Sequence, residues 1–139
     1  MNGSLQSTAH QALSELLDVS PQVEFAVIVE PDGTPIASAR RTGTSEDAMA
    51  GDFGTLVTRV LDQAERSRSE LGRERVTQCE VSTGKGNLFV VTDGQRHVAA
   101  ITESEPTVGL VFYDLKTALR TLRTSESPTS EPSSDGANV

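Results

Sequence analysis

Residues 23–29 are the segment that most restricts the folds open to this chain. The odd-numbered positions from Val23 to Val29 are all apolar and would share one side of an extended strand, while Ala26 and Ile28 make the other side apolar as well. A strand that is apolar on both sides has to be covered from both sides. We therefore expect this strand to lie inside a sheet that has helices packed against both of its faces.

A tight turn and a returning strand follow directly. Residues 31–34 read Pro-Asp-Gly-Thr, in which the glycine can supply the positive φ that such turns require. Residues 36–39 are then short and mostly apolar, as expected of a strand that runs back beside the first. The two strands are predicted to form a hairpin.

Three stretches carry apolar residues at helical spacing. The first covers residues 4–18 and is ended by Pro21. The second covers residues 46–70, and the third begins at Pro106 and Thr107. The chain is therefore predicted to contain three helices, of which the second is the longest.

The long helix has two notable features. Gly51 and Gly54 each cost about 1 kcal/mol relative to alanine inside a helix, so we expect this pair to let another backbone come close, from a sheet or a second helix. The apolar stripe of the helix consists of Met49, Phe53, Leu56, Val57, Val60 and Ala64.

Three strands joined by short turns follow the long helix. Residues 76–83 have mixed character, residues 88–91 are continuously apolar, and residues 98–101 follow the turn signal Asp93-Gly94. Hairpin connections make neighbouring strands antiparallel. The order α-β-β-α-β-β-β-α therefore predicts an α+β fold, a three-layer α/β/α sandwich around a five-stranded antiparallel sheet.

The charge and composition of the 139-residue chain exclude several classes of protein. The chain has 12 basic and 20 acidic residues and a formal net charge of −8, which argues against binding to nucleic acid. Its single cysteine excludes an internal disulfide and indicates a reducing compartment. No apolar run reaches the ~18 residues of a membrane span. We expect a soluble, cytoplasmic protein with no nucleic-acid partner and no membrane insertion.

The last residues, 124–139, differ in composition from the rest of the chain. Nine of these sixteen are Ser, Thr or Pro, three are acidic and none is basic. Such a segment buries too little apolar surface to offset the entropy lost on ordering. We therefore expect residues 1–123 to form one domain and residues 124–139 to form a disordered acidic tail.

The sequence contains no pattern typical of a catalytic or metal site. Gly84-Lys85-Gly86 lacks the earlier glycine and the following hydroxyl residue of a phosphate-binding loop, and it precedes a strand rather than a helix. His10 and His97 lack metal-ligand spacing, and Cys79 lies within a strand without a neighbouring basic pair. We predict no catalytic residue, no cofactor and no metal, and hence a protein that is not an enzyme.

One basic feature stands out in this acidic chain. Arg40 and Arg41 lie just before the long helix, and a cluster of arginines lies where that helix runs into the third strand, namely Arg66, Arg68, Arg73 and Arg75. If the helix packs beside the end of the second strand, these residues would form one docking patch, because arginine is favoured at interaction hot spots. The alternative interpretation is a solvated helix end with no partner.

The chain resembles the Roadblock/dynein-light-chain superfamily over about residues 10–123, and in particular its bacterial MglB-like branch. The resemblance rests on the element order and on three stretches: VEFAVIVEPDGTPIAS at residues 23–38, GKGNLFVV at residues 84–91, and TVGLVFYDL at residues 107–115. Each stretch is a soft pattern, so the specificity lies in their joint order.

The resemblance implies a roadblock fold, which is profilin-like, with one helix on one face of the sheet and two on the other. Members typically form homodimers by pairing the third strand and the long second helix of each chain into a ten-stranded sheet. Such pairing would satisfy the free backbone groups of an edge strand and bring Cys79 near its symmetry mate. The interface residues implied for this chain are Phe53, Leu56, Val57, Val60, Val76, Gln78, Cys79 and Val81.

The resemblance also implies a function, which is to bind a small Ras-like GTPase as a homodimer and to modulate its GTP hydrolysis or nucleotide state. Docking of that partner would then fall to Arg40, Arg41, Arg66 and Arg73. One alternative is a scaffold or adaptor of the same fold that assembles a motor or signalling complex without affecting hydrolysis. The other is an enzyme or small-ligand sensor built on a profilin-like sheet.

Overall fold

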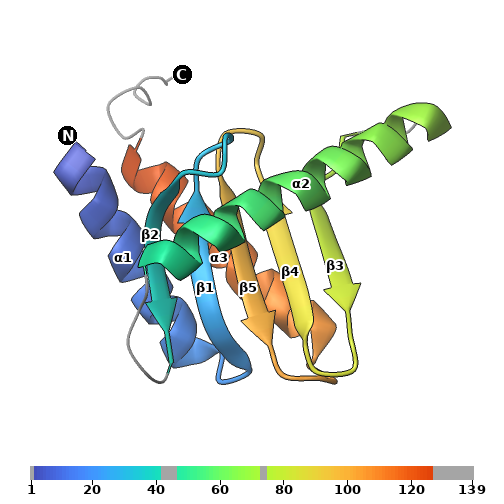
Figure 1. Ribbon diagram of the computed structural model, residues 1–139. Helices are drawn as coiled ribbons and strands as arrows, with labels where there is room; N and C mark the ends of the chain where they lie inside the picture. The colour runs from blue at the N-terminus through green and yellow to red at the C-terminus, as the bar shows by residue number, and fades with distance from the viewer. Residues whose placement is uncertain (1, 42–46, 73–74, 127–139) are drawn as a thin grey trace, which may run out of the picture.

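The computed structural model describes residues 2–41, 47–72 and 75–126 of the chain (Figure 1). Helices and strands follow one another in the order expected from the sequence. Their bounds are α1 (Asn2–Val19), β1 (Val23–Val29), β2 (Pro35–Arg40), α2 (Asp47–Leu71), β3 (Gln78–Ser82), β4 (Asn87–Thr92), β5 (His97–Thr102) and α3 (Val108–Glu126).

The five strands form one antiparallel sheet with the order β2-β1-β5-β4-β3. Its register is seen in one row across the sheet, in which Val27 pairs with Ala99, Ala99 with Val90, and Val90 with Cys79. β1 lies between β2 and β5, and within the described ranges β4 is the only strand hydrogen-bonded to β3. The edges of the sheet are therefore β2 and β3.

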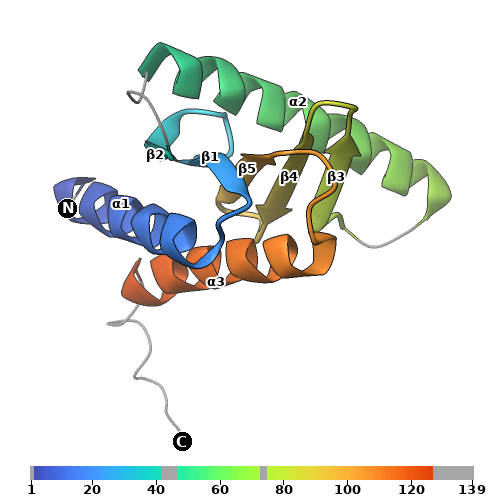
Figure 2. The ribbon, with the colours of Figure 1, turned by 90° about the horizontal axis from the view of Figure 1, so that it is seen from below.

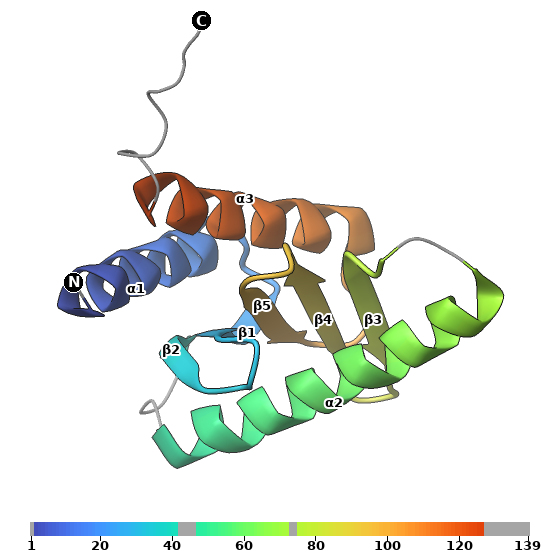
Figure 3. The same cartoon turned by 90° about the horizontal axis from the view of Figure 1, so that it is seen from above.

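Helices cover both faces of the sheet, with α1 and α3 side by side on one face and α2 alone on the other (Figures 2 and 3). Ala26 and Ile28 of β1 belong to the core beneath α1 and α3, whereas Phe25 and Val27 belong to the core beneath α2. Val23 was expected on the side of Phe25, but the register with β5 shifts between these two residues and Val23 joins the α1–α3 core. The three-layer α+β fold with a five-stranded antiparallel sheet is confirmed.

The β1–β2 turn rests directly on the backbone of α2 at a pair of glycines. Gly33 has a φ of +94°, and a methyl group on Gly54 would collide with the carbonyl oxygen of Gly33. A methyl group on Gly51 would meet nothing within 4 Å. The close backbone approach expected in α2 therefore occurs at Gly54 and not at Gly51, and the approaching backbone is a turn of the sheet.

The side chain of Arg41 binds carbonyl groups at the C-terminal end of α1, although Arg41 lies far from this helix in the sequence. Its guanidinium donates to the carbonyl oxygens of Leu17 at 2.8 Å, Ser20 at 2.9 Å and Val23 at 2.9 Å. A helix leaves its last carbonyl groups without intrahelical partners, and a cation interacts favourably with that end of the helix dipole. Arg41 thereby ties the end of β2 to the end of α1.

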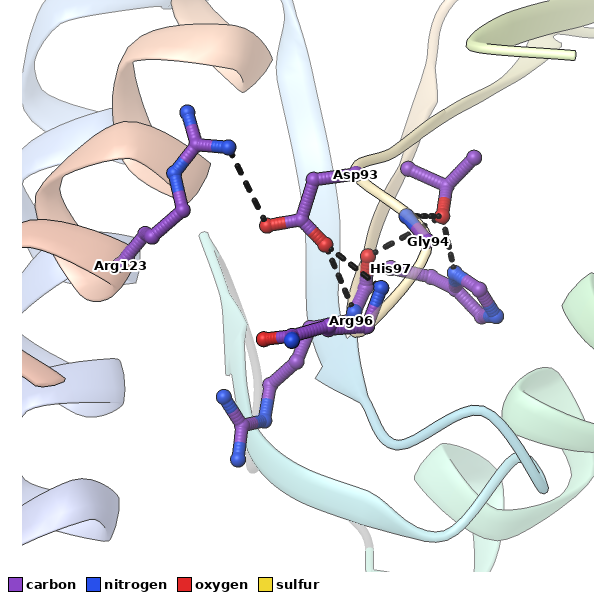
Figure 4. A network of polar contacts seen from close by, with 7 residues as sticks. Asp93, Gly94, Arg96, His97 and Arg123 are labelled. Atoms are coloured by element: carbon purple, nitrogen blue, oxygen red, sulfur yellow. Dashed lines mark hydrogen bonds and ion pairs between the residues drawn. The ribbon is translucent and has the colours of Figure 1, made fainter. Parts of the chain in front are cut away.

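The β4–β5 turn is held by a polar network at one end of the sheet (Figure 4). Asp93 accepts a hydrogen bond from the backbone amide of Arg96 at 2.9 Å, and its second oxygen lies 3.8 Å from a guanidinium nitrogen of Arg123 on α3. His97 contacts the hydroxyl of Thr92 through Nδ1 at 2.8 Å. The β4–β5 turn is thus connected to α3 through Arg123, and the contact between His97 and Thr92 joins the start of β5 to the end of β4.

Several elements extend one or two residues beyond the ranges expected from the sequence, whereas β3 is shorter than expected and α3 is longer. β3 begins at Gln78 rather than at Val76, because the backbone amide of Val76 donates to a carboxylate oxygen of Glu65 on α2 instead of joining a strand. α3 continues to Glu126, past the expected domain boundary at residue 123. Most of the expected tail, residues 127–139, lies outside the described residues.

Candidate interaction surface

β3 leaves one side of the sheet open for pairing. Among the described residues it is hydrogen-bonded to β4 on one side only, and Glu80, Val81 and Ser82 are exposed. Val81 retains 42% of its side-chain accessibility, which is high for an apolar residue in a strand. An exposed edge strand presents unpaired N–H and C=O groups that a second chain can pair with.

α2 crosses the sheet from β2 to β3 and extends beyond the β3 edge (Figure 1). Phe53, Val57 and Leu61 face the sheet and are buried, while Leu56 on the same helix is exposed. Beyond Leu61 the helix continues for ten further residues and ends at Leu71, which is 72% exposed. The outer face and the far end of α2 are therefore not used by the core of this chain.

A row of apolar side chains on the α2 side continues from the β3 edge into the sheet. Val81 of β3 pairs with Leu88 of β4, and Leu88 pairs with Ile101 of β5. Leu88 and Ile101 are only partly buried, although both pack against the core beneath α2. We call Leu56, Val81, Leu88 and Ile101 the α2–β3 surface.

A single carboxylate fixes the geometry between α2 and β3. Glu65 accepts from Nε of Arg68 at 2.6 Å and from the backbone amide of Val76 at 3.0 Å. These hydrogen bonds lower the pKa of Glu65, because they favour its ionised form. Glu65 therefore holds the distal half of the helix beside the start of the edge strand.

The sequence matches the family model of the Roadblock/LC7 domain over residues 10–103. The chain belongs to the Roadblock/LC7 family. This confirms the resemblance seen in the sequence, and the match covers the elements that form the α2–β3 surface. A comparison with curated protein sequences gives no match.

Solved structures show the same roadblock fold at low sequence identity. A Roadblock/LC7 domain from Streptomyces avermitilis has a TM-score of 0.76 and 18% identity, and the match covers 84% of this chain and 96% of that one. MglB from Myxococcus xanthus has a TM-score of 0.74 and 16% identity, covering 94% and 95%. A structure described as MglB with a tetrameric arrangement has a TM-score of 0.76 and 18% identity, covering 88% and 90%. The bacterial MglB-like branch is thus represented among these structures.

The roadblock fold separates the eight expected interface residues into two groups. Phe53 and Val57 are buried against the chain's own sheet, so they position α2 rather than offer a surface. The remaining six are exposed or partly buried on α2, on β3 or just before β3, and these are Leu56, Val60, Val76, Gln78, Cys79 and Val81. Leu61, absent from the expected helical stripe, is buried beside Phe53 and Val57.

The structure describes three of the four expected docking arginines and places them in different surroundings. Arg40 stacks on the ring of Phe25 with 5.5 Å to its centroid, and Arg41 is engaged at the end of α1. Arg66 is exposed in the C-terminal half of α2, separated from the start of the helix by about 28 Å at 1.5 Å per residue. Arg73 lies outside the described residues.

The structural role of Arg41 was missed by the sequence reasoning. Its three carbonyl partners lie 18 to 24 positions earlier in the chain. The available signal was the absence of a basic residue in the last turn of α1, whose carbonyl end therefore needed a partner from elsewhere.

The single cysteine of the chain, Cys79, lies on β3 and is partly buried. Burial raises the pKa of the Cys79 thiol, which keeps it protonated at neutral pH. Within residues 2–41, 47–72 and 75–126, no group of His, Cys, Asp or Glu side chains could hold a metal ion. None of the helices in these ranges combines the length and the apolar character that crossing a membrane requires.

Proposed function

We propose that this Roadblock/LC7 chain is a homodimeric regulator that binds a small Ras-like GTPase in the cytoplasm and modulates its GTP hydrolysis or nucleotide state. It contributes no catalytic residue of its own and acts on the conformation of its partner. The observation that carries the proposal is family membership together with the roadblock fold shared with MglB across nearly the whole length of both chains.

The α2–β3 surface supports the homodimer. Pairing of two β3 strands would satisfy their open backbone groups, and it would bring Val81, Leu88 and Leu56 against the same residues of a second chain. The described tetrameric arrangement of MglB supports self-association as a property of relatives with this fold. Cys79 on β3 would then lie near its symmetry mate.

The GTPase would dock on the outer face of α2, where the dimer presents two copies of the helix. Arg66 is exposed on this helix, whereas the described hydrogen bonds of Arg41 are directed to the chain's own carbonyl groups. We therefore assign the electrostatic part of docking to Arg66 rather than to Arg40 and Arg41. Arginine at such a position favours contact with acidic residues and with planar groups of a partner.

The experiment is affinity capture with the full chain as bait, offered in parallel to native lysate loaded with GDP or with a non-hydrolysable GTP analogue. We expect a small GTPase to be recovered mainly with the GTP analogue, and its GTP turnover to change when the purified chain is added. Arg66→Glu is expected to weaken capture, while Lys85→Glu, an equal charge reversal on the exposed β3–β4 turn, leaves it unchanged.

A scaffold or adaptor remains the second candidate function, and the same experiment separates the two. A stable complex recovered equally in both nucleotide arms, with no change in GTP turnover, favours the scaffold. Recovery of no GTPase in either arm contradicts the proposed regulator. The exposed far end of α2, which ends at Leu71, is the observation that favours a larger assembly.

A further inference from the structure

A second surface lies on the opposite face of the molecule, between α1 and α3. These helices run side by side on the face of the sheet that α2 does not cover (Figures 2 and 3). Between them is a groove of about 370 Å³, whose lining includes Glu15, Leu16 and Val19 from α1 and Tyr113 and Asp114 from α3. Its size is within the range of sites that receive side chains or small ligands.

One side-chain oxygen of Asp114, Oδ2, has no hydrogen-bond donor among the residues that the structure describes. The side chain of Asp114 is 9% exposed, and this Oδ2 atom is buried. A buried carboxylate oxygen without a donor is costly, and nearly all such groups in folded proteins are paired. Because Asp114 also lines the groove, a positively charged donor of a ligand would pair with its carboxylate more strongly than a neutral donor.

The described neighbours of Asp114 do not supply a donor to Oδ2. On α3, the positions one turn before and after it are occupied by Leu110 and Ala118, and the hydroxyl of Thr117 already donates to the carbonyl oxygen of Tyr113 at 3.0 Å. The cations of α3, among them Lys116 and Arg120, line a different hollow beside β4. Lys116 does not share a face of α3 with Asp114, because residues two positions apart on a helix point in different directions.

Two exposed apolar side chains flank the groove. Val19 is 64% exposed at the end of α1, and Tyr113 is 63% exposed on α3. Glu15 adds a second carboxylate to the lining, and it accepts a hydrogen bond from Gln11 on the outside of α1. The combination of a buried carboxylate, a negative rim and two uncovered apolar side chains fits a ligand that is both cationic and apolar.

We propose that the α1–α3 groove docks a linear segment of a partner protein in which one Lys or Arg is flanked by apolar residues. The cation pairs with Asp114 inside the groove, and the apolar neighbours pack on Val19 and Tyr113. The acidic C-terminal residues of this chain are excluded as the occupant by charge, because residues 127–139 contain Glu131 and Asp135 and no basic residue. The inference does not depend on the GTPase proposal, since the groove and α2 lie on opposite faces.

The test is selection of a random peptide library displayed on phage against the immobilised full chain, followed by affinity measurement with the synthesised peptides. We expect the enriched peptides to share one Lys or Arg beside apolar residues. Asp114→Asn should lower their affinity by about tenfold or more, because it removes the buried charge while keeping the shape. Replacing the basic residue of the peptide by norleucine should cost a similar factor and should not add to the effect of Asp114→Asn.

Controls separate docking from folding. Asp52→Asn removes an exposed carboxylate from α2 on the opposite face and should leave peptide affinity unchanged. Tyr113→Ser alters an exposed side chain and should weaken binding without affecting the fold. The melting temperature of Asp114→Asn should not fall below that of the wild type, because Oδ2 accepts no hydrogen bond from the described residues that the substitution could remove. An enriched motif without a basic residue, or an affinity that Asp114→Asn leaves unchanged, would overturn the proposal.

Discussion

At the scale of single residues, Gly54 limits how closely the sheet and α2 can pack. We expect Gly54→Ala to destabilise the protein by about 1–3 kcal/mol, because the new methyl group collides with the carbonyl oxygen of Gly33 and outweighs the gain in helix propensity. Gly51→Ala is the matched control, and with open space around it that substitution should stabilise by up to about 1 kcal/mol. Urea denaturation of both variants measures the difference, and stabilisation by both would contradict the close contact.

Arg41 acts at the same scale, because one side chain satisfies three carbonyl groups near the end of α1. We expect Arg41→Ala to lower the free energy of unfolding by about 1–3 kcal/mol, the range for hydrogen bonds that involve a charged group. Arg66→Ala removes an exposed cation and should change stability by no more than about 0.5 kcal/mol. Thermal unfolding followed by circular dichroism compares the two, and equal losses would show that Arg41 does not stabilise α1.

At the scale of elements, His97 makes the packing of β5 beneath α2 sensitive to pH. Burial lowers the pKa of His97 below its ordinary value of 6.5, since the charged form is poorly solvated there. Below about pH 6.5 the unfolded chain therefore binds a proton that the folded chain does not, and stability is lost as the pH falls through this region. Above about pH 6.5, His97 is neutral in both the folded and the unfolded chain, and its contribution to stability no longer changes with pH.

The lowered pKa of His97 predicts a measurable dependence of the free energy of unfolding on pH. Between pH 7 and about 5.5, the free energy of unfolding of the wild type should fall, and His97→Gln should flatten that dependence whatever its effect at pH 7. His10→Gln removes the other histidine, which is exposed, and should leave the slope as it is. Chemical denaturation at several pH values gives the slopes, and an unchanged slope in His97→Gln would show that its burial is not linked to folding.

The elements also show how far sequence reasoning reaches. Alternation in residues 23–29 and the glycine turns predicted the strands, their order along the chain and the double coverage of the sheet, because local chemistry determines these features. The same reasoning could not decide which apolar residues of α2 face the chain's own sheet. Leu56 belonged to the expected apolar stripe and Leu61 did not, yet the angle at which α2 crosses the strands buries Leu61 and exposes Leu56.

Long-range pairings could not be predicted for a related reason. Glu65 takes the amide of Val76 and shortens β3, and Arg41 reaches back to Leu17 and Ser20. Each of these contacts joins segments that are brought together only by the complete fold, so no local sequence pattern predicts it. The unpartnered oxygen of Asp114 belongs to the same class, because the absence of a donor is visible only once α1 and α3 are in place.

At the scale of the whole molecule, the sheet separates two surfaces of different character. The α2–β3 surface combines an open strand edge with apolar side chains, which suits a symmetric contact between two copies, since identical edges can pair with each other. The α1–α3 groove is lined by the carboxylates of Glu15 and Asp114, which suits a segment of different composition. Because the surfaces lie on opposite faces, a dimer formed through one leaves both copies of the other accessible.

This separation gives a prediction about assembly. Val81→Asp places a charge on the β3 edge. In the dimer this charge would lie against the same charge of the second chain or be buried without water. We expect it to weaken self-association by about tenfold or more. Val108→Asp is the matched control, because Val108 is also an exposed valine but begins α3 on the other face of the sheet. Sedimentation equilibrium should show a dimer for the wild type and for Val108→Asp, and a folded monomer for Val81→Asp. If all three proteins have the mass of a monomer, or if Val81→Asp stays dimeric, the β3 edge is not where two copies of this chain meet.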